Sequence, residues 1–390
     1  MFARGLAMTW CAAAFSMLFF AAPPAAADWR TGLDAFNAGD LDTAASAFSA
    51  LCESQPDWYG GHLMLGQTLL RQKKASTALR PLERAHELHP HASTALPLAQ
   101  AAAALGRWNL VKDVLHDVRV ESLESARHLG FHRLRGRAAL GLGDWANATV
   151  QLERAAVLDP ENADLHLHLA LAARRTDQLQ KAESHYQTAL RLAPSRTSTL
   201  RDLTAVRHAR AMAAAGPDRA QICRQAAPES LALLRDLKTT LRTRLVVAQL
   251  QACAGDRDRA ETILKATHSR DLSNWQPLYH LARLYADGHR WTEAEAALEK
   301  LTRYRLDDAD ARRAESLWGR VYEGQQRFDL AIERYAALGD EVKLERARRA
   351  LDIQRRNQEL EEIQRQIDET LAAQGELDLE EKKLAAGHGD

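Results

Sequence analysis

The stretch Trp58–Pro90 reads WYGGHLMLGQTLLRQKKASTALRPLERAHELHP and decides the fold. Apolar residues recur at helical spacing in Leu65–Leu70 and again in Ala78–Leu88. Lys73–Ser76 interrupt this pattern, and Pro90 follows the last apolar residue, where a helix must end. The stretch therefore predicts two helices joined by a short turn.

The two helices must also lie close together. Gly66 in the first helix and Ala78 in the second are small residues, and we expect them to face each other. A larger side chain at either position would force the helices apart, at a cost of about 1–3 kcal/mol.

The unit recurs along the chain with one spacing. Self-similarity at a fixed period indicates stacked helix–turn–helix units, and we expect about eight of them between Trp29 and Leu338. The pairs 34 residues apart are Ala44 and Ala78, Ala148 and Ala182, Ala260 and Ala294, Pro56 and Pro90, and Pro160 and Pro194.

These residues resemble the tetratricopeptide repeat family. The resemblance implies an all-α, right-handed α-solenoid of helix–turn–helix repeats, with a concave groove lined by the first helix of each unit. The function that it implies is binding of a partner protein or peptide. The chain is rich in alanine and shows no sustained period-2 alternation, which agrees with an all-α fold.

The repeat phase divides the chain into segments. It is lost after Pro194, where Gly216-Pro217 separates two helical stretches, and returns near Leu241. This connector is either a degenerate unit or a hinge. We expect a signal peptide (1–27), an N-terminal array of about five repeats (28–194), an irregular helical connector (195–240), a C-terminal array of about three repeats (241–338), a charged helix (339–384) and a disordered tail (385–390).

The first 27 residues have the layout of a secretory signal peptide. Arg4 precedes an apolar run, Pro23-Pro24 ends it, and Ala25-Ala26-Ala27 offers a cleavage site before Asp28. We expect cleavage after Ala27 and a periplasmic or secreted protein. The alternative is an uncleaved membrane anchor, since the run approaches the length of a span.

Three cysteines would remain after cleavage. Cys223 and Cys253 flank the irregular segment and could form a disulfide in an oxidising compartment, which leaves Cys52 unpaired. The alternative is two separate buried thiols, because a free cysteine packs as a small apolar residue.

The segment Glu341–Leu371 is dense in charges of both signs and lacks glycine and proline. Ile353, Leu360 and Ile367 lie seven residues apart, with Ile363 between them. Two readings follow: a helix that caps the exposed end of the last repeat, or a short coiled coil that joins copies of the chain.

The net charge gives no reason to expect a nucleic-acid partner, and the sequence shows no catalytic motif. Loss of residues 1–27 removes one basic residue from 52 basic and 52 acidic ones, leaving a net charge of about −1. The histidines have no zinc-like spacing, and no nucleophile elbow or phosphate loop occurs. We therefore predict no enzyme activity, no cofactor and no metal site.

The exposed side of the first helices predicts a basic inner surface, suited to an acidic or carboxylate-bearing partner because guanidinium groups match carboxylates. The alternative is that these arginines form ordinary ion pairs between neighbouring helices. The candidate groove residues are Gln67, Arg71, Arg133, Arg137, His168, Arg174 and Arg175.

The sequence thus predicts an exported, non-catalytic scaffold that binds a partner protein or peptide, in envelope or secretion-complex assembly. The alternative function is an oligomeric structural protein assembled through Glu341–Leu371.

Overall fold

The structure is a computed structural model that describes residues 25–236 and 238–386. The described residues contain α-helices and two short 3-10 helices, and no strand. The chain divides into two compact units, Met1–Thr199 and Leu200–Asp390, which are described separately below as unit 1 and unit 2.

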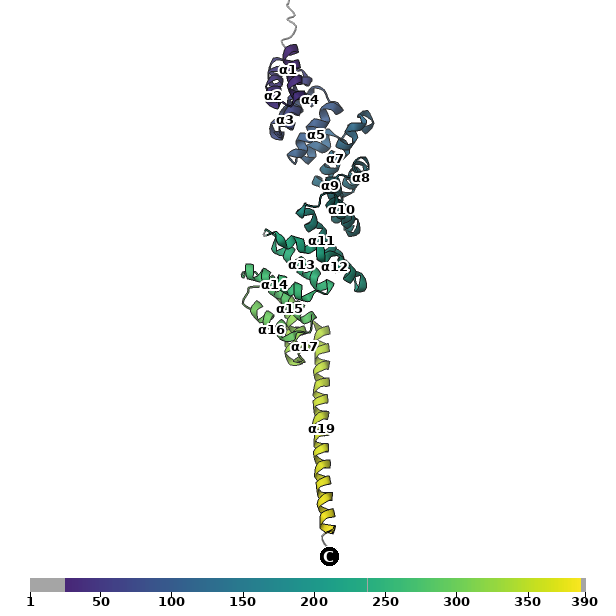
Figure 1. The fold of residues 1–390 in the computed structure, drawn as a ribbon, viewed down its shortest axis with the longest axis vertical. Helices are drawn as coiled ribbons and strands as arrows, with labels where there is room; N and C mark the ends of the chain where they lie inside the picture. The colour runs from purple at the N-terminus through teal and green to yellow at the C-terminus, as the bar shows by residue number, and fades with distance from the viewer. Residues whose placement is uncertain (1–24, 237, 387–390) are drawn as a thin grey trace, which may run out of the picture. The chain divides into compact units, whose positions relative to one another are not determined.

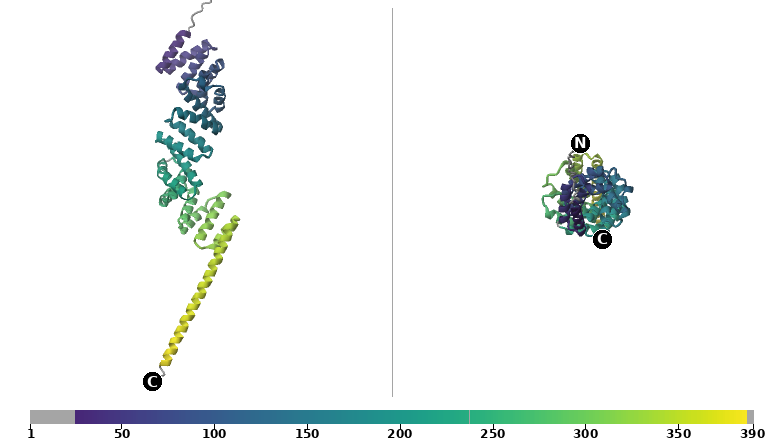
Figure 2. Two further views of the ribbon diagram at one scale, coloured as in Figure 1. Left: turned by 90° about the vertical axis from the view of Figure 1, so that its right-hand side faces the viewer. Right: turned by 90° about the horizontal axis from the view of Figure 1, so that it is seen from above.

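Unit 1 is a stack of helix pairs. Each odd-numbered helix packs against the even-numbered helix that follows it, and each even-numbered helix packs against the next pair. Figure 2 shows these pairs, in purple to blue, following one another in chain order. The helices are α1 (Ala25–Ala38), α2 (Leu41–Ser54), α3 (Tyr59–Arg71), α4 (Ala75–Leu88), α5 (Ala92–Ala104), α6 (Trp108–Val114), α7 (Ser125–Leu142), α8 (Trp145–Leu158), α9 (Ala163–Arg175) and α10 (Leu179–Leu192), with η1 (Val120–Ser122) before α7.

Unit 2 repeats the arrangement and ends in one long helix (Figure 1). α11 (Thr197–Ala213) begins just before its first residue. The other elements are α12 (Gly216–Ser230), η2 (Leu231–Arg235), α13 (Leu241–Ala254), α14 (Arg257–Arg270), α15 (Gln276–Asp287), α16 (Trp291–Leu301), α17 (Asp308–Gly324), α18 (Phe328–Leu338) and α19 (Glu341–Ala386). The prediction of an all-α solenoid of helix–turn–helix repeats with a long C-terminal helix is confirmed.

The turn within each pair has a common backbone device. One residue adopts a positive φ, a conformation that glycine tolerates best. In three turns this glycine precedes an aspartate whose carboxylate accepts the backbone N–H three residues later, which caps the second helix. The positive-φ turn residues are Gly39, Lys73, Gly106, Gly143, Asp177, Gly216, Gly255, His289 and Gln326, and the capping aspartates are Asp40, Asp144 and Asp256.

The repeated alanines lie at the tightest part of each pair. Ala44, Ala78, Ala148, Ala182, Ala260 and Ala294 are all fully buried. The expectation that Gly66 faces Ala78 is wrong, however. A Cβ at Gly66 would lie 2.3 Å from Cγ of Leu82, so the glycine makes room for a large side chain of the second helix.

This glycine contact recurs in four pairs at a separation of 16 residues. The pairs are Gly32 with Phe48, Gly66 with Leu82, Gly136 with Leu152, and Gly319 with Tyr335. The sequence period of alanine and glycine therefore records one packing geometry, in which a first-helix glycine receives a buried second-helix side chain.

The connector expected at 195–240 is largely helical. α11 and α12 are separated at Gly216, and Arg207 of α11 forms an ion pair of 2.7 Å with Glu229 of α12. Ala211, Cys223 and Leu250 share a small buried cluster. This stretch therefore contains two helices in contact, with longer spacing between its turns than in the other pairs.

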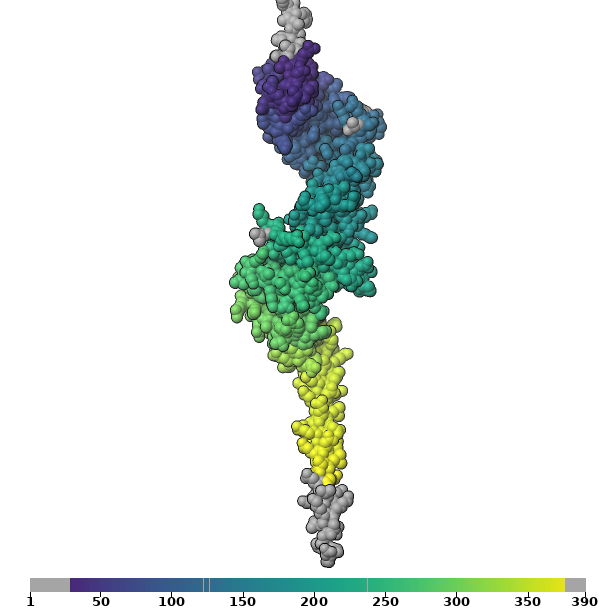
Figure 3. Space-filling view, in the orientation of Figure 1, coloured from purple at the N-terminus to yellow at the C-terminus, as the bar shows by residue number. Residues whose placement is uncertain are grey.

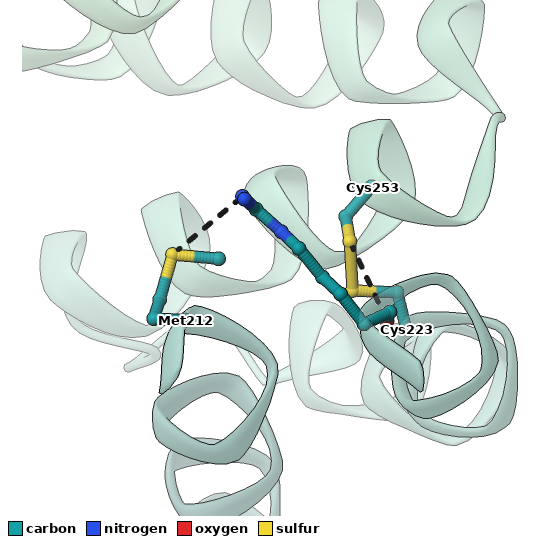
Figure 4. The surroundings of a disulfide bond; sticks show 4 residues. Met212, Cys223 and Cys253 are labelled. Carbon is teal, nitrogen blue, oxygen red and sulfur yellow. Dashed lines mark hydrogen bonds between the residues drawn. A yellow bond between two sulfur atoms is a disulfide. The ribbon is translucent and has the colours of Figure 1, made fainter. Parts of the chain in front are cut away.

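A disulfide joins α12 to α13. Cys223 and Cys253 are bonded, with their Cα atoms 5.7 Å apart, while Cys52 is a free thiol. Figure 4 shows the surroundings of this bond, including Met212, whose sulfur lies 3.9 Å from a guanidinium nitrogen of Arg219.

The long helix α19 combines a cap with an exposed extension. Leu344 and Ala347 are buried against the last pair, where α19 packs on α18. Farther along, the residues from Arg355 to Gly375 are all exposed. Its end includes Ala385 and Ala386, and the rest of the expected disordered tail lies outside the described residues.

The expected signal peptide falls mostly outside the described residues, and Ala25–Ala27 form the start of α1. Within the described ranges, no helix has both the length and the apolar character needed to cross a bilayer.

Candidate partner-binding groove

Three successive first helices of unit 1 line a groove of about 320 Å³. Its lining includes Gln67 from α3, Leu96 and Gln100 from α5, and Arg133 and Leu134 from α7. The groove combines apolar floor, neutral amides and cationic groups, because consecutive first helices present one face each to the same side of the stack.

The middle helix adds a backbone acceptor. Pro97 lacks an N–H, so the carbonyl of Ser93 does not receive the bond that an α-helix normally supplies. Ser93 and Pro97 both line the groove.

The groove is cationic because Arg127 and Arg133 line it and its three helices carry no carboxylates. α3, α5 and α7 contain no aspartate or glutamate. Arg127 is held at 3.7 Å by Glu124, which precedes α7, whereas Arg133 is exposed and has no ion pair in the part of the chain that the structure describes. Arg133 is therefore available to a ligand.

Arg137 and His168 extend the cationic surface from α7 to α9. The guanidinium of Arg137 lies 5.6 Å from the ring centroid of Trp108. His168 is half-buried, and its Nδ1 has no hydrogen-bond partner among the described residues. Burial first, and then the nearby charges of Arg137 and Arg133, lower the pKa of His168. The charged form of this histidine is therefore disfavoured, and its Nδ1 is left without a described partner.

Two of the other predicted groove residues contact neighbouring repeats. Arg71 donates to the carbonyl of Phe36 at 3.2 Å and covers its ring at 3.7 Å. Arg175 lies 5.5 Å from the ring centroid of Trp145. Arg174 is half-buried in the last turn of α9 and is not a free charge.

Two tryptophans that follow turns fill gaps between repeats. A Cβ at Gly141 of α7 would lie 2.3 Å from the ring of Trp108, and one at Gly324 of α17 would lie 2.4 Å from the ring of Trp291.

Sequence reasoning missed the contribution of α5. Leu96, Pro97 and Gln100 belong to the unit whose repeat pattern is weakest, and so they were not assigned to the groove. A proline in the middle of an alanine-rich helix is the signal that marks this surface.

Unit 2 has a different inner surface. A groove of about 520 Å³ is lined by Arg242, Gln249, Trp275, Tyr279 and His280, among others. Burial, with smaller contributions from Arg283 and His208, lowers the pKa of His280 to about 4.

Several arginines of unit 2 bind carboxylates of its own repeats. Glu261 illustrates this. Its burial raises its pKa, but hydrogen bonds from Lys265, Arg290 and Tyr285 outweigh that effect and lower the pKa to about 2. Further pairs between helices are Arg320 with Asp287, Arg327 with Glu295, Arg334 with Glu315, and Arg346 with Glu323.

Histidines act as links between helices. His132 is buried and bonds Gln151 at 2.9 Å, and His166 bonds His185 at 3.2 Å. Within the described residues, no group of three histidine, cysteine or carboxylate side chains is arranged to hold a metal ion.

Two stretches of the chain match the model of a known repeat family. The model of the tetratricopeptide repeat matches residues 29–93 and 133–197, which cover the first two pairs and the pairs formed by α7 to α10. The chain contains tetratricopeptide repeats in these two stretches. Repeats of this family form scaffolds for protein–protein interaction.

Solved structures show weak global similarity. A structure of MamA residues 41 to the end from Desulfovibrio magneticus RS-1 is 19% identical, with a TM-score of 0.39, over 44% of this chain and 96% of that one. The tetratricopeptide domain of P58(IPK) is 17% identical, with a TM-score of 0.27, over 85% of this chain and 99% of that one. No curated protein matches the chain.

Proposed function

We propose that the chain is an exported scaffold that binds an acidic or carboxylate-bearing segment of a partner protein in the groove of α3, α5 and α7. The observation that carries this proposal is Arg133, an exposed guanidinium without an ion pair among the described residues, in a groove whose three helices have no carboxylate.

The chemistry of the groove supports an acidic peptide. Arg133 and Arg137 lie one helical turn apart on α7, so both can approach one carboxylate-bearing stretch. A hydrogen bond to a charged group contributes about 1.5–3 kcal/mol. The packed helix pairs hold the groove in place before binding, which lowers the ordering cost.

The location proposed is the periplasm or the extracellular space, after cleavage following Ala27. The bond between Cys223 and Cys253 supports an oxidising compartment. Expression of the full chain with an active export pathway, followed by intact-mass measurement, should give a protein that begins at Asp28. A mature protein that retains Met1 would contradict cleavage.

The role proposed is assembly of an envelope or secretion complex, and site-specific capture tests the groove. A photo-crosslinking residue is placed at Gln100 in the groove and, as a control, at Arg154 on the exposed face of α8. After crosslinking in the native envelope, mass spectrometry should identify an acidic segment of one protein attached to position 100, and no such segment attached to position 154.

Affinity for the captured segment then tests the chemistry. Arg133→Ala should weaken binding about 10- to 100-fold, from the charged hydrogen bond it loses. Arg154→Ala removes the same charge from the other face and should leave affinity unchanged. If Asp or Glu residues of the captured segment are changed to Asn or Gln, the Arg133→Ala substitution should cause no further loss of affinity for that segment. Equal affinity of the Arg133→Ala variant and the parent would overturn the proposal.

A further inference from the structure

Unit 2 also contains a small pocket whose lining includes residues of second helices. Its volume is about 150 Å³, roughly that of five water molecules in the liquid, so it suits a small ligand. The lining residues come from α11 to α15. These helices belong to the repeat region of unit 2, which is teal to green in Figure 3 and is followed by α19 in yellow.

One wall of the pocket is aliphatic. Ala248 of α13, Leu264 of α14 and Leu284 of α15 line it, and all three are buried. Ala252 extends this wall along α13. Hydrocarbon is favoured against such a wall because the contact removes apolar surface from water, so a ligand that fits here carries a short aliphatic chain.

Three arginines from three helices line the same pocket: Arg219 of α12, Arg257 of α14 and Arg283 of α15. Arg219 is half-buried and forms no ion pair among residues 25–236 and 238–386. Its guanidinium contacts the thioether sulfur of Met212 at 3.9 Å, which is a weak acceptor, so donors remain for a ligand. Arg257 donates to the backbone carbonyl of Asp287 at 2.9 Å, which orients its guanidinium without neutralising the charge.

The acidic groups near the pocket do not balance these arginines. Asp287 is the single carboxylate among the described residues that line it. Its Oδ1 accepts a hydrogen bond from Arg320 at 2.7 Å, and its Oδ2 lies 3.8 Å from Arg283. One carboxylate is thus shared between a lining arginine and an arginine outside the pocket. The carboxylates that adjoin the lining arginines in the sequence, without lining the pocket, are Asp218, Asp256 and Asp258.

Two histidines beside the pocket respond to this positive charge. Burial, and then the charges of three arginines, lower the pKa of His208, against a hydrogen bond with Gln249 that raises it. The three arginines are Arg219, Arg283 and Arg242. His280 lines the pocket, and its pKa is lowered to about 4 by burial and then by Arg283 and His208. The charged forms of both histidines are therefore disfavoured, and an anion would relieve the excess of positive charge.

The disulfide holds the backbone of Arg219 beside the pocket. Cys223 lies one helical turn after Arg219 on α12, and its partner Cys253 lines the pocket from α13. The carbonyl oxygen of Arg219 lies 3.9 Å from the sulfur of Cys253. The covalent link between α12 and α13 therefore places this arginine before a ligand binds, which lowers the ordering cost of binding.

We propose that this pocket binds a carboxylate carried on a short aliphatic chain. The guanidinium groups take the carboxylate, because their paired donors match its two oxygens. The aliphatic wall takes the chain. Small organic acids and the glutamate side chains of peptides share this chemistry. The site consists of unit 2 residues alone, so it stands or falls independently of the groove of α3, α5 and α7.

Ligand-detected NMR titration of the disulfide-bonded chain with butanoate tests the site. The parent should bind butanoate saturably, and 1-butanol, which lacks the carboxylate, should show no saturable binding. Arg219→Gln should weaken butanoate binding about 10- to 100-fold, because charged hydrogen bonds are lost. The control, Arg224→Gln, removes an exposed charge from the same helix outside the pocket and should leave affinity unchanged. A parent that does not bind butanoate, or equal affinity of Arg219→Gln and the parent, overturns the proposal.

A second variant guards against a folding defect. Circular dichroism checks that Arg219→Gln retains the helical content and thermal midpoint of the parent. Arg283→Gln changes an exposed lining residue and should also weaken butanoate binding. If Arg219→Gln does not fold, an unchanged affinity of Arg283→Gln overturns the proposal in its place. Arg133→Ala should not alter butanoate binding, which separates this result from the test of the unit 1 groove.

Two further ligands define the aliphatic chain and its source. Acetate is two methylenes shorter than butanoate and should bind up to about 15-fold more weakly, from about 0.8 kcal/mol per buried methylene. Equal affinities for acetate and butanoate would overturn the role of the aliphatic wall. N-acetylglutamate α-amide presents the side-chain carboxylate of a peptide. Tighter binding of this compound than of butanoate supports a protein segment as the source, and weaker binding supports a free organic acid.

Discussion

Two glycines in one helix offer a direct test of how the repeats pack. Gly130 and Gly136 both lie within α7. A Cβ at Gly136 would lie 2.6 Å from Cγ and 2.8 Å from Cδ2 of the fully buried Leu152, whereas a Cβ at Gly130 would have nothing within 4 Å. Gly136→Ala should therefore destabilise the pair of α7 and α8, and Gly130→Ala should stabilise α7.

The expected magnitudes follow from two terms. Alanine is favoured over glycine inside a helix by about 0.8–1.0 kcal/mol, and this gain is common to both variants. Only Gly136→Ala also forces Leu152 to move, because the clash involves its branch point, and such overpacking costs about 1–3 kcal/mol. The two variants should therefore differ by about 1–3 kcal/mol.

Amide hydrogen exchange is the appropriate assay, because repeat arrays open locally and need not unfold in one step. Peptides from α7 and α8 should exchange about 5- to 150-fold faster in Gly136→Ala than in Gly130→Ala. Peptides from α1 and α2 serve as the internal control and should be unchanged in both variants. Equal exchange in the two variants would refute the role of Leu152.

Three further outcomes are expected for unit 2. Reduction of the Cys223–Cys253 bond, which closes a separation of 30 residues, should lower the unfolding free energy by about 3–4 kcal/mol in urea titrations on the chain-entropy model, and alkylation should then modify two more sulfurs. Because the pKa of His280 is lowered in the folded state, the contribution of the neutral histidine to the unfolding free energy is full above about pH 6.5 and is lost as the pH falls toward 4. Thermal stability should therefore decline over this pH window, and it should decline less steeply in the His280→Gln variant. Because the pKa of Glu261 is lowered in the folded state, the contribution of its carboxylate to the unfolding free energy is full above about pH 4.5 and is lost as the pH falls toward 2. A Glu261→Gln variant that unfolds in acid at the same pH as the parent would contradict this.

Individual arginines of the two units differ in their contacts. In unit 2, Arg290 and Arg327 bind carboxylates from neighbouring repeats, so their charge holds the array together. In unit 1, Arg137 rests on an aromatic ring and Arg133 has no described ion pair. The same residue type is therefore paired with carboxylates at these two positions of unit 2, whereas Arg133 of unit 1 has no ion pair among the described residues.

The sequence by itself determined the repeat architecture. Alanine, glycine and proline keep one phase because each pair has the same close approach, and this local requirement is visible without coordinates. The turn at Lys73 and the end of α4 before Pro90 follow the same logic, since positive φ and proline act within a few residues.

Only the tertiary structure decided which side chains are free. The sequence places Arg71, Arg133 and Arg137 on one side of the stack. In the structure, however, the guanidinium of Arg71 packs on the ring of Phe36, whereas Arg133 is exposed and has no ion pair among the described residues. The sequence also paired Gly66 with Ala78, where the structure pairs it with Leu82. Periodicity fixes which face of a helix is buried, but the neighbour opposite each residue depends on the rotation and distance between helices, and those are set by packing across the whole pair.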